Sequence, residues 1–219
     1  MDYRKAFEEG IRGFRAPAVL FSGGLDSSLI AFFAVEPKLY TLCYTERSYD
    51  FINAKKSASL LGLDFEPVFF TIDDIKEAFA LSKNSLDIAH YILAKNIREK
   101  KVLSGQGADE LFLGYAKYAR MSTEEKVIKA RDDFERWIQK GIEKRIFALF
   151  DKEIIFPYIT LKDLAFSLPL EERDGKKFLH SLAISLGLPE EIALQRKKAM
   201  QYGSGMEKVV KKLSASSLS

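Results

Sequence analysis

The sequence predicts an α/β fold in which a doubly wound parallel sheet is followed by a helical annex. Three observations lead to this prediction. Short apolar runs alternate with helical patterns over the first half of the chain, and the first run is followed directly by a glycine-rich turn and a helix start. From about Ser122 the pattern becomes helical throughout. Strands that alternate with helices pair in parallel through right-handed crossovers.

The expected elements follow from hydrophobic periodicity and turn chemistry. Strands are expected near residues 18–22, 39–44, 66–70 and 101–104. Helices are expected near residues 26–35, 50–62, 73–81 and 85–100. Thr71 and Asp74 have capping-box spacing, and Gly62 marks a helix end. No fifth strand can be placed from the sequence.

Length and composition predict one domain that spans residues 1–219. With 219 residues, 47% of them apolar, the chain can bury a core together with an annex. We expect the α/β core over 16–120, the annex over 121–212 and a flexible tail over 213–219. The annex opens with a capping box from Ser122 to Glu125. Its apolar stripe is expected to be core, and any exposed part would suit a homodimer interface.

Charge and cysteine content exclude several classes of protein. The chain has 34 basic and 31 acidic residues and lacks a basic block or an aromatic RNA-binding pattern, so nucleic-acid recognition is not expected. The single cysteine, Cys43, excludes an internal disulfide and reads as a small buried residue. The first ten residues contain no signal-peptide core, and no apolar run is long enough to span a membrane. We therefore expect a soluble cytoplasmic protein.

The turn after the first apolar run has the features of a phosphate-binding loop. It reads Ser22-Gly23-Gly24-Leu25-Asp26-Ser27-Ser28. Glycines let backbone amides converge on an anion, with the positive end of the following helix behind them. No Lys follows the glycines, so this is not the GxxxxGK[ST] loop. The alternative is an ordinary strand–helix turn with a capping Ser or Asp.

A second glycine-rich turn follows the apolar run at 102–103. It reads Ser104-Gly105-Gln106-Gly107-Ala108-Asp109-Glu110. Ligands of open α/β sheets bind beyond the carboxyl ends of the strands, so two such turns on neighbouring strands would face one crevice. Asp26 and Asp109 would then share a metal ion. The alternative for Asp109 and Glu110 is simple stabilisation of a helix N-terminus by acidic residues.

A third segment lies near the end of the sequence. It contains Leu188-Pro189, then Arg196-Lys197-Lys198 and, further on, Gly203 and Gly205. A lysine in such a segment, for example Lys198, is a compact point charge on a long stem, which suits contact with phosphate. The alternative is a basic, solvated helix end with a glycine cap. His90 falls on the polar side of its helical pattern and is expected at the surface, and no zinc-type cluster exists.

These three segments resemble one family. The first turn is similar to the PP-loop of the N-type ATP pyrophosphatases, and the second resembles the SGEGSDELFGGY signature of the synthetase domain of asparagine synthetases and β-lactam synthetases. The third is similar to the LP..I..R.K....G.G tail of asparagine synthetases. Lys176–His180 loosely resembles the family's KxxLR element, and Ile155–Ile159 its PFLD-like element. The resemblance covers about residues 16–212.

The resemblance implies an adenine nucleotide alpha hydrolase-like fold and an ATP-dependent ligase. Such an enzyme adenylates a carboxylate, here aspartate or a related acid, releases pyrophosphate and passes the acyl group to ammonia or another amine. The implied cofactors are ATP and Mg2+, with Asp26 and Asp109 as the metal ligands. The implied catalytic residues are Gln106, Lys198 and Asp109. The implied nucleotide-binding residues are Leu20, Ser22, Gly23, Gly24, Asp26, Ser27, Ser28, Leu42, Cys43, Ser104, Gly105, Gly107, Gly203 and Gly205.

The sequence also departs from this family. Gln106 stands where the family has a Glu that deprotonates or orients the amine, and an amide is no base. Loss of a general base slows a reaction by about 10²–10⁴-fold. Asp2 follows Met1 where glutamine-using relatives have a catalytic Cys, so ammonia is expected from solution or from a separate glutaminase subunit.

Two other functions remain open at this point. One is a nucleotide-binding regulatory or partner subunit that has lost amidation, which Gln106 would favour. The other is a different PP-loop ligase, such as a tRNA-modifying enzyme, which the absence of cysteine pairs and zinc spacing disfavours.

Overall fold

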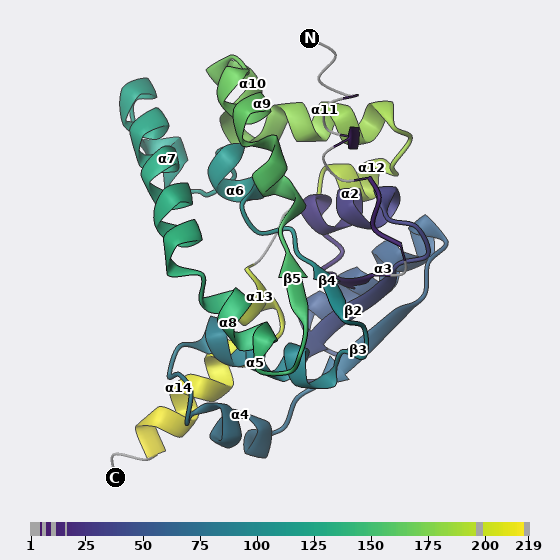
Figure 1. Cartoon of the computed structure of the whole chain (residues 1–219), viewed down its shortest axis with the longest axis vertical. Helices are drawn as coiled ribbons and strands as arrows, with labels where there is room; N and C mark the ends of the chain where they lie inside the picture. The colour runs from purple at the N-terminus through teal and green to yellow at the C-terminus, as the bar shows by residue number, and fades with distance from the viewer. Residues whose placement is uncertain (1–4, 6–7, 10–11, 16, 196–198, 217–219) are drawn as a thin grey trace.

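The computed structural model describes residues 5, 8–9, 12–15, 17–195 and 199–216 and shows a parallel sheet between two layers of helices (Figure 1). Every strand pairing is parallel, and the strands are ordered β3-β2-β1-β4-β5. The strands are β1 (Ala18–Leu20), β2 (Lys38–Cys43), β3 (Phe65–Phe69), β4 (Lys101–Leu103) and β5 (Glu153–Ile155). The predicted α/β fold class and its first four strands are confirmed.

The helices of the core follow the strands as the periodicity predicts. They are α2 (Leu25–Phe33), α3 (Tyr49–Leu61), α4 (Ile72–Ala78), α5 (Ser85–Asn96) and α6 (Ala108–Leu111). Both predicted capping boxes form, at Thr71 and at Ser122. Gly62 ends α3 with a φ of 66°, a left-handed conformation that glycine adopts without a steric penalty.

The annex contains short helices packed around one long one. They are α7 (Thr123–Lys140), α8 (Ile142–Ala148), α9 (Lys162–Ser167), α10 (Leu170–Arg173), α11 (Lys177–Ser185), α12 (Glu190–Ala193), α13 (Met200–Gly203) and α14 (Met206–Ser216). The described residues also form three 3-10 turns, namely Tyr118–Arg120, Pro157–Leu161 and Asp174–Lys176. Within the described residues, none of the helices is both long and apolar enough to span a membrane.

Alternate residues of each strand point into two separate cores. Val19 and Leu103 pack with α2, α3, α11 and α12 on one face, whereas Ala18 and Val102 pack with α4, α5, α8 and α14 on the other. Side chains of a strand alternate between the faces of its sheet, so one short strand serves both cores. The sheet is thus covered on both sides, as parallel sheets usually are.

The strand order reverses at β1. The chain runs outward from β1 to β2 and β3, then returns to place β4 on the other side of β1. The two glycine-rich turns leave the carboxyl ends of β1 and β4, which are neighbours in the sheet. Ligands of open α/β sheets bind at such a switch point.

Two expectations about the annex and α5 are wrong. The annex is not helical throughout, because Glu153–Ile155 forms β5 and pairs with β4. Core and annex therefore share one sheet, and no clean boundary separates them near residue 120. His90, expected at the surface, is fully buried. The helix α5 lies between the sheet and the helices α8 and α14, so its polar side faces protein.

Candidate functional site

A cavity of about 650 Å³ opens beyond the carboxyl ends of β1, β2 and β4. Its volume lies in the range of small-molecule sites. The walls come from both glycine-rich turns, from α7 and α8, and from the chain around Gly175 and Met200. The sequence-predicted residues that line it are Leu20, Ser22, Gly24, Asp26, Ser27, Leu42, Ser104, Gly105, Gln106, Gly107 and Asp109.

Some predicted residues do not line this cavity. They are Gly23, Ser28, Cys43, Gly203 and Gly205. Cys43 and Ser28 are fully buried, with the Sγ of Cys43 directed at the carbonyl oxygen of Thr41 at 3.5 Å. Lys198, the lysine predicted to reach phosphate, lies outside the described residues.

The first turn is held against α3 by contacts that only glycine permits. Gly23 has a φ of 74°, and a β-carbon there would lie 2.6 Å from the carbonyl oxygen of Asn53. Ser57 Oγ donates to the carbonyl of Gly23 at 2.8 Å. Inside the turn, the backbone N–H of Ser22 donates to Ser27 Oγ at 3.3 Å. The turn is therefore compact, and Leu25, the first residue of α2, lines the cavity.

The second turn packs directly on the first. A β-carbon on Gly105 would lie 3.2 Å from Cβ of Asp26 and 3.4 Å from the backbone nitrogen of Ser27. Tyr158, from the segment that resembles the PFLD-like element, donates its hydroxyl to the backbone carbonyl of Asp26 at 3.1 Å. Two turns distant in sequence and one annex residue thus fix the position of Asp26.

Lys176 joins the two aspartates that the sequence singles out. Its Nζ lies 2.6 Å from Oδ2 of Asp26 and 2.6 Å from Oδ1 of Asp109. The lysine is 7% exposed and adopts a φ of 63°, next to Gly175 with a φ of 64°. This left-handed pair turns the chain just before α11 and directs the side chain inward. A β-carbon on Gly114 would overlap both Asp109 and Lys176.

Sequence reasoning missed the role of Lys176. Lys176 is the first residue of the segment that loosely resembles the KxxLR element, but no functional role was assigned to that segment from the sequence. Its buried position between two carboxylates depends on the Gly175–Lys176 turn, which no periodicity reveals.

The two aspartates fit a magnesium site. Mg2+ is bound in proteins by one or two carboxylates together with substrate phosphates. Asp26 and Asp109 already converge on one cation, the ammonium of Lys176. Among residues 17–195 and 199–216, no cluster of three or more His, Cys, Asp or Glu side chains is placed to hold a metal ion. The ligand set therefore suits a metal that is partly coordinated by phosphate.

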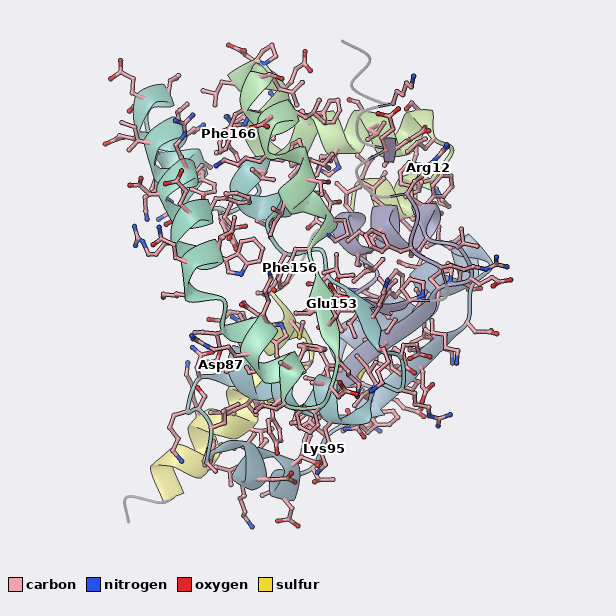
Figure 2. All side chains as sticks on the ribbon, viewed as in Figure 1. Arg12, Asp87, Lys95, Glu153, Phe156 and Phe166 are labelled. Carbon is pink, nitrogen blue, oxygen red and sulfur yellow. The ribbon has the colours of Figure 1, made fainter. Side chains whose placement is uncertain are left out.

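Gln106 points toward a buried carboxylate that the sequence did not single out. Its Nε2 donates to Oε1 of Glu143 at 3.4 Å. Trp137 Nε1 donates to the same oxygen at 3.2 Å. Glu143 is 7% exposed and lines the cavity from α8. Phe156, near the middle of the molecule in Figure 2, packs edge-on against the ring of Trp137 at 4.9 Å between centroids.

Burial shifts the pKa values of several groups near the cavity. Burial, reinforced by Glu110 and Asp109, raises the pKa of Tyr115, whose hydroxyl donates to Oε1 of Glu110 at 2.9 Å. Burial, with a smaller contribution from Asp50, raises the pKa of the Cys43 thiol to about 12. These groups stay protonated near neutral pH, so neither serves as a base or a nucleophile in this site.

His90 lies behind Glu143. Its ring packs 6.2 Å from that of Phe147, which is one helical turn after Glu143 on α8. Neither ring nitrogen has a hydrogen-bond partner among the described residues. Burial lowers the pKa of His90, against the opposing influence of Glu143 and Asp87. His90 is therefore neutral near pH 7.

Comparison with known proteins identifies relatives of the chain. The family model described as asparagine synthase matches residues 4–150. A candidate glutamine-hydrolyzing asparagine synthetase of Methanocaldococcus jannaschii is 30% identical over 93% of this chain and 48% of its own length. The glutamine-hydrolyzing asparagine synthetase of Gallus gallus is 29% identical over 91% of this chain and 42% of its own. The chain thus spans about half the length of these relatives.

A solved structure resembles the chain more distantly. It is described as a predicted subunit of a tRNA methyltransferase from Methanocaldococcus jannaschii. It aligns with a TM-score of 0.38 and 19% identity, over 85% of this chain and 95% of that one. A TM-score and identity this low give no evidence about function.

Proposed function

The chain belongs to the asparagine synthase family, and from this premise we propose that it is an ATP-dependent ligase that forms an amide. In this proposal it adenylates a carboxylate, releases pyrophosphate and transfers the acyl group to ammonia or another amine. Aspartate or a related acid is the proposed carboxylate. ATP is the proposed second substrate, and Mg2+ is the proposed metal.

One observation carries the proposal. Asp26 follows β1 and Asp109 follows β4, and their carboxylates meet on the Nζ of Lys176 at 2.6 Å each. The two carboxylates meet at the switch point of the sheet, in the wall of the cavity around the two turns. Two carboxylates and a lysine at that position suit the triphosphate of a nucleotide and its metal.

Different residues of the cavity have different proposed roles in the first step, the adenylation of the carboxylate. The hydroxyls of Ser22 and Ser27 and the amides of the first turn would bind the departing pyrophosphate. Leu20 and Leu42, at the ends of β1 and β2, would contact adenine. Asp26 and Asp109 would hold Mg2+, which when bound neutralises charge on the phosphates. A carboxylate oxygen of the acid substrate attacks the α-phosphorus, and the bond from that phosphorus to the pyrophosphate oxygen breaks.

Lys176 would bind the phosphate oxygens of the nucleotide. With Mg2+ held by Asp26 and Asp109, the Lys176 ammonium would be available to these oxygens. Lysine suits this role because it is a point charge on a flexible stem. The acyl-adenylate that results has a good leaving group, so an amine can displace AMP in the second step.

Carboxylate-dependent exchange of labelled pyrophosphate into ATP tests the proposal directly. We expect one acid in a panel of amino acids and related carboxylates to support exchange. Asp109→Asn should reduce that exchange by about 100-fold or more, because it removes a charge from the reacting centre. Asp163→Asn, an exposed residue of α9, is the matched control and should leave exchange unchanged.

A regulatory nucleotide-binding subunit is the second candidate, because Gln106 replaces the Glu that the family resemblance leads us to expect. Binding of ATP with Mg2+, measured by calorimetry, without exchange for any acid would favour this candidate. Such a result would exclude the ligase.

A further inference from the structure

The residue at position 106 is a glutamine, which cannot accept a proton from an attacking amine. An amide-forming ligase needs a group that removes that proton, or at least one that binds the amine. The cavity supplies a carboxylate one hydrogen bond away from Gln106, that of Glu143 on α8. This inference rests on the proposed function and specifies how its second step proceeds.

Glu143 is held in the cavity wall by two donors on one oxygen. Both Gln106 Nε2, at 3.4 Å, and Trp137 Nε1, at 3.2 Å, reach Oε1. Within the described part of the chain no hydrogen bond reaches Oε2, and that atom is not among the fully enclosed polar atoms without a partner. One carboxylate oxygen is therefore anchored, and the other is left for a ligand in the cavity.

Gln106 carries a second acceptor without a donor in the described part of the chain, its side-chain oxygen Oε1. A carboxylate accepts hydrogen bonds only, so the contact with Glu143 fixes the amide with its Nε2 toward Glu143. Gln106 Oε1 then points away from Glu143, and it is buried without a partner among the described residues. A buried acceptor without a donor is costly unless a ligand supplies one. Oε2 of Glu143 and Oε1 of Gln106 are thus two neighbouring residues' acceptors that N–H donors of a ligand can satisfy.

We propose that Glu143 binds the amine substrate together with Gln106 and accepts its proton when the amide forms. The nitrogen lone pair attacks the carbonyl carbon of the acyl-adenylate, and a C–N bond forms. The bond from that carbon to the phosphate oxygen breaks, and AMP leaves with the electron pair. The surplus proton on nitrogen passes to the Glu143 carboxylate. The base at this site therefore comes from α8 and not from the turn after β4.

The alternative is a purely structural Glu143 that ties α8 to α7 through Trp137. Such a residue would affect stability and both half-reactions alike. A base acts only on the second half-reaction, so the two roles separate when the half-reactions are measured individually.

The first experiment measures both half-reactions for Glu143→Gln, which keeps the size of the side chain. Pyrophosphate exchange should stay at the wild-type rate, while amide formation should fall by about 10²–10⁴-fold. Adding Gln106→Glu to this variant should restore much of the lost rate, because a carboxylate returns to the neighbouring position. Glu135→Gln, at an exposed site on α7, is the matched control.

Two results of this experiment would overturn the proposal. One is amide formation by Glu143→Gln at the wild-type rate. The other is an equal loss in both half-reactions without rescue by Gln106→Glu, which is the result expected of a structural residue.

The second experiment does not depend on catalysis. Trp137 is the only tryptophan of the chain and contacts Glu143 directly, so its fluorescence reports on ligands at this carboxylate. Methylammonium should produce a saturable change in emission that Glu143→Gln abolishes. Tetramethylammonium has no N–H donor and should produce none. If no acid supports exchange, the ligase proposal fails, yet this titration still decides whether an amine site exists: no change with methylammonium excludes it.

Discussion

Lys176 and Asp109 form an ion pair, 2.6 Å from Nζ to Oδ1, in which the lysine is more deeply buried than the carboxylate it neutralises. The same ammonium contacts both carboxylate oxygens of Asp26, at 2.7 and 2.6 Å. One cation therefore balances two carboxylates that come from opposite sides of the switch point.

Lys176→Met should destabilise the protein by about 3–5 kcal/mol, because it removes the ammonium that contacts the buried Asp26 and the partly buried Asp109. Mg2+ should restore part of this loss, since it replaces the ammonium between the same two groups. The measurement is the urea unfolding of wild type and variant with and without MgCl2. Lys177→Met, at the exposed neighbouring position, is the control. Equal magnesium responses of Lys176→Met and Lys177→Met would contradict this account.

Gly23→Ala should destabilise the protein more than Gly62→Ala does. Both glycines have a similar left-handed φ, 74° and 66°, but a β-carbon meets the backbone of Asn53 only at Gly23. The difference between the two variants in unfolding free energy, expected at about 1–3 kcal/mol, isolates the collision with α3. Chemical denaturation of both variants measures it. Similar losses would show that α3 moves aside.

His90 should make the protein less stable in mild acid. Burial lowers its pKa in the folded state, so below its ordinary value of about 6.5 only the unfolded chain takes up the proton. The free energy of unfolding therefore falls as pH drops below 6.5 toward the folded pKa. His90→Leu should reduce the stability difference between about pH 7.5 and pH 5, measured by urea unfolding.

Cys43 should make the protein less stable in mild alkali. Its folded pKa of about 12 exceeds the ordinary thiol value, so above about pH 9 the unfolded chain loses the proton first. Stability then falls by up to about 1.4 kcal/mol per pH unit. Cys43→Ala should flatten this fall between about pH 9 and pH 10 in urea unfolding series. Tyr40→Phe should change the pH dependence of stability only at higher pH, because the unfolded tyrosine loses its proton near pH 10.

The sequence predicted the parts of the site that local chemistry determines. Strand β1 with its turn, and β4 with its turn, carry recognisable signals because glycine spacing and apolar runs are local properties. Asp26 and Asp109 could therefore be named in advance, and the parallel sheet explains why they meet. Their proposed role as metal ligands stays a prediction.

The remaining parts depend on tertiary packing. Glu143 reaches Gln106 through the tertiary packing of α8, which contacts α5, and nothing in the pattern around residue 143 distinguishes it from a solvated glutamate. His90 is buried because α5 has protein on several sides. The side of α5 that carries polar residues in the sequence pattern is therefore not exposed to solvent. Strand β5 is three residues long and precedes Pro157, too short for an alternating pattern to appear.

That short strand has a consequence for any shorter form of this protein. The family match ends at residue 150, just before β5. The backbone of β5 is hydrogen-bonded to the β4 strand: the N–H of Glu153 donates to the carbonyl of Lys100 at 2.8 Å, and the N–H of Ser104 donates to the carbonyl of Ile155 at 3.0 Å. A fragment cut at that boundary would turn β4 from an interior strand into an open edge. Unpaired strand edges recruit other chains, so such a fragment would tend to self-associate through the very strand that carries the second turn.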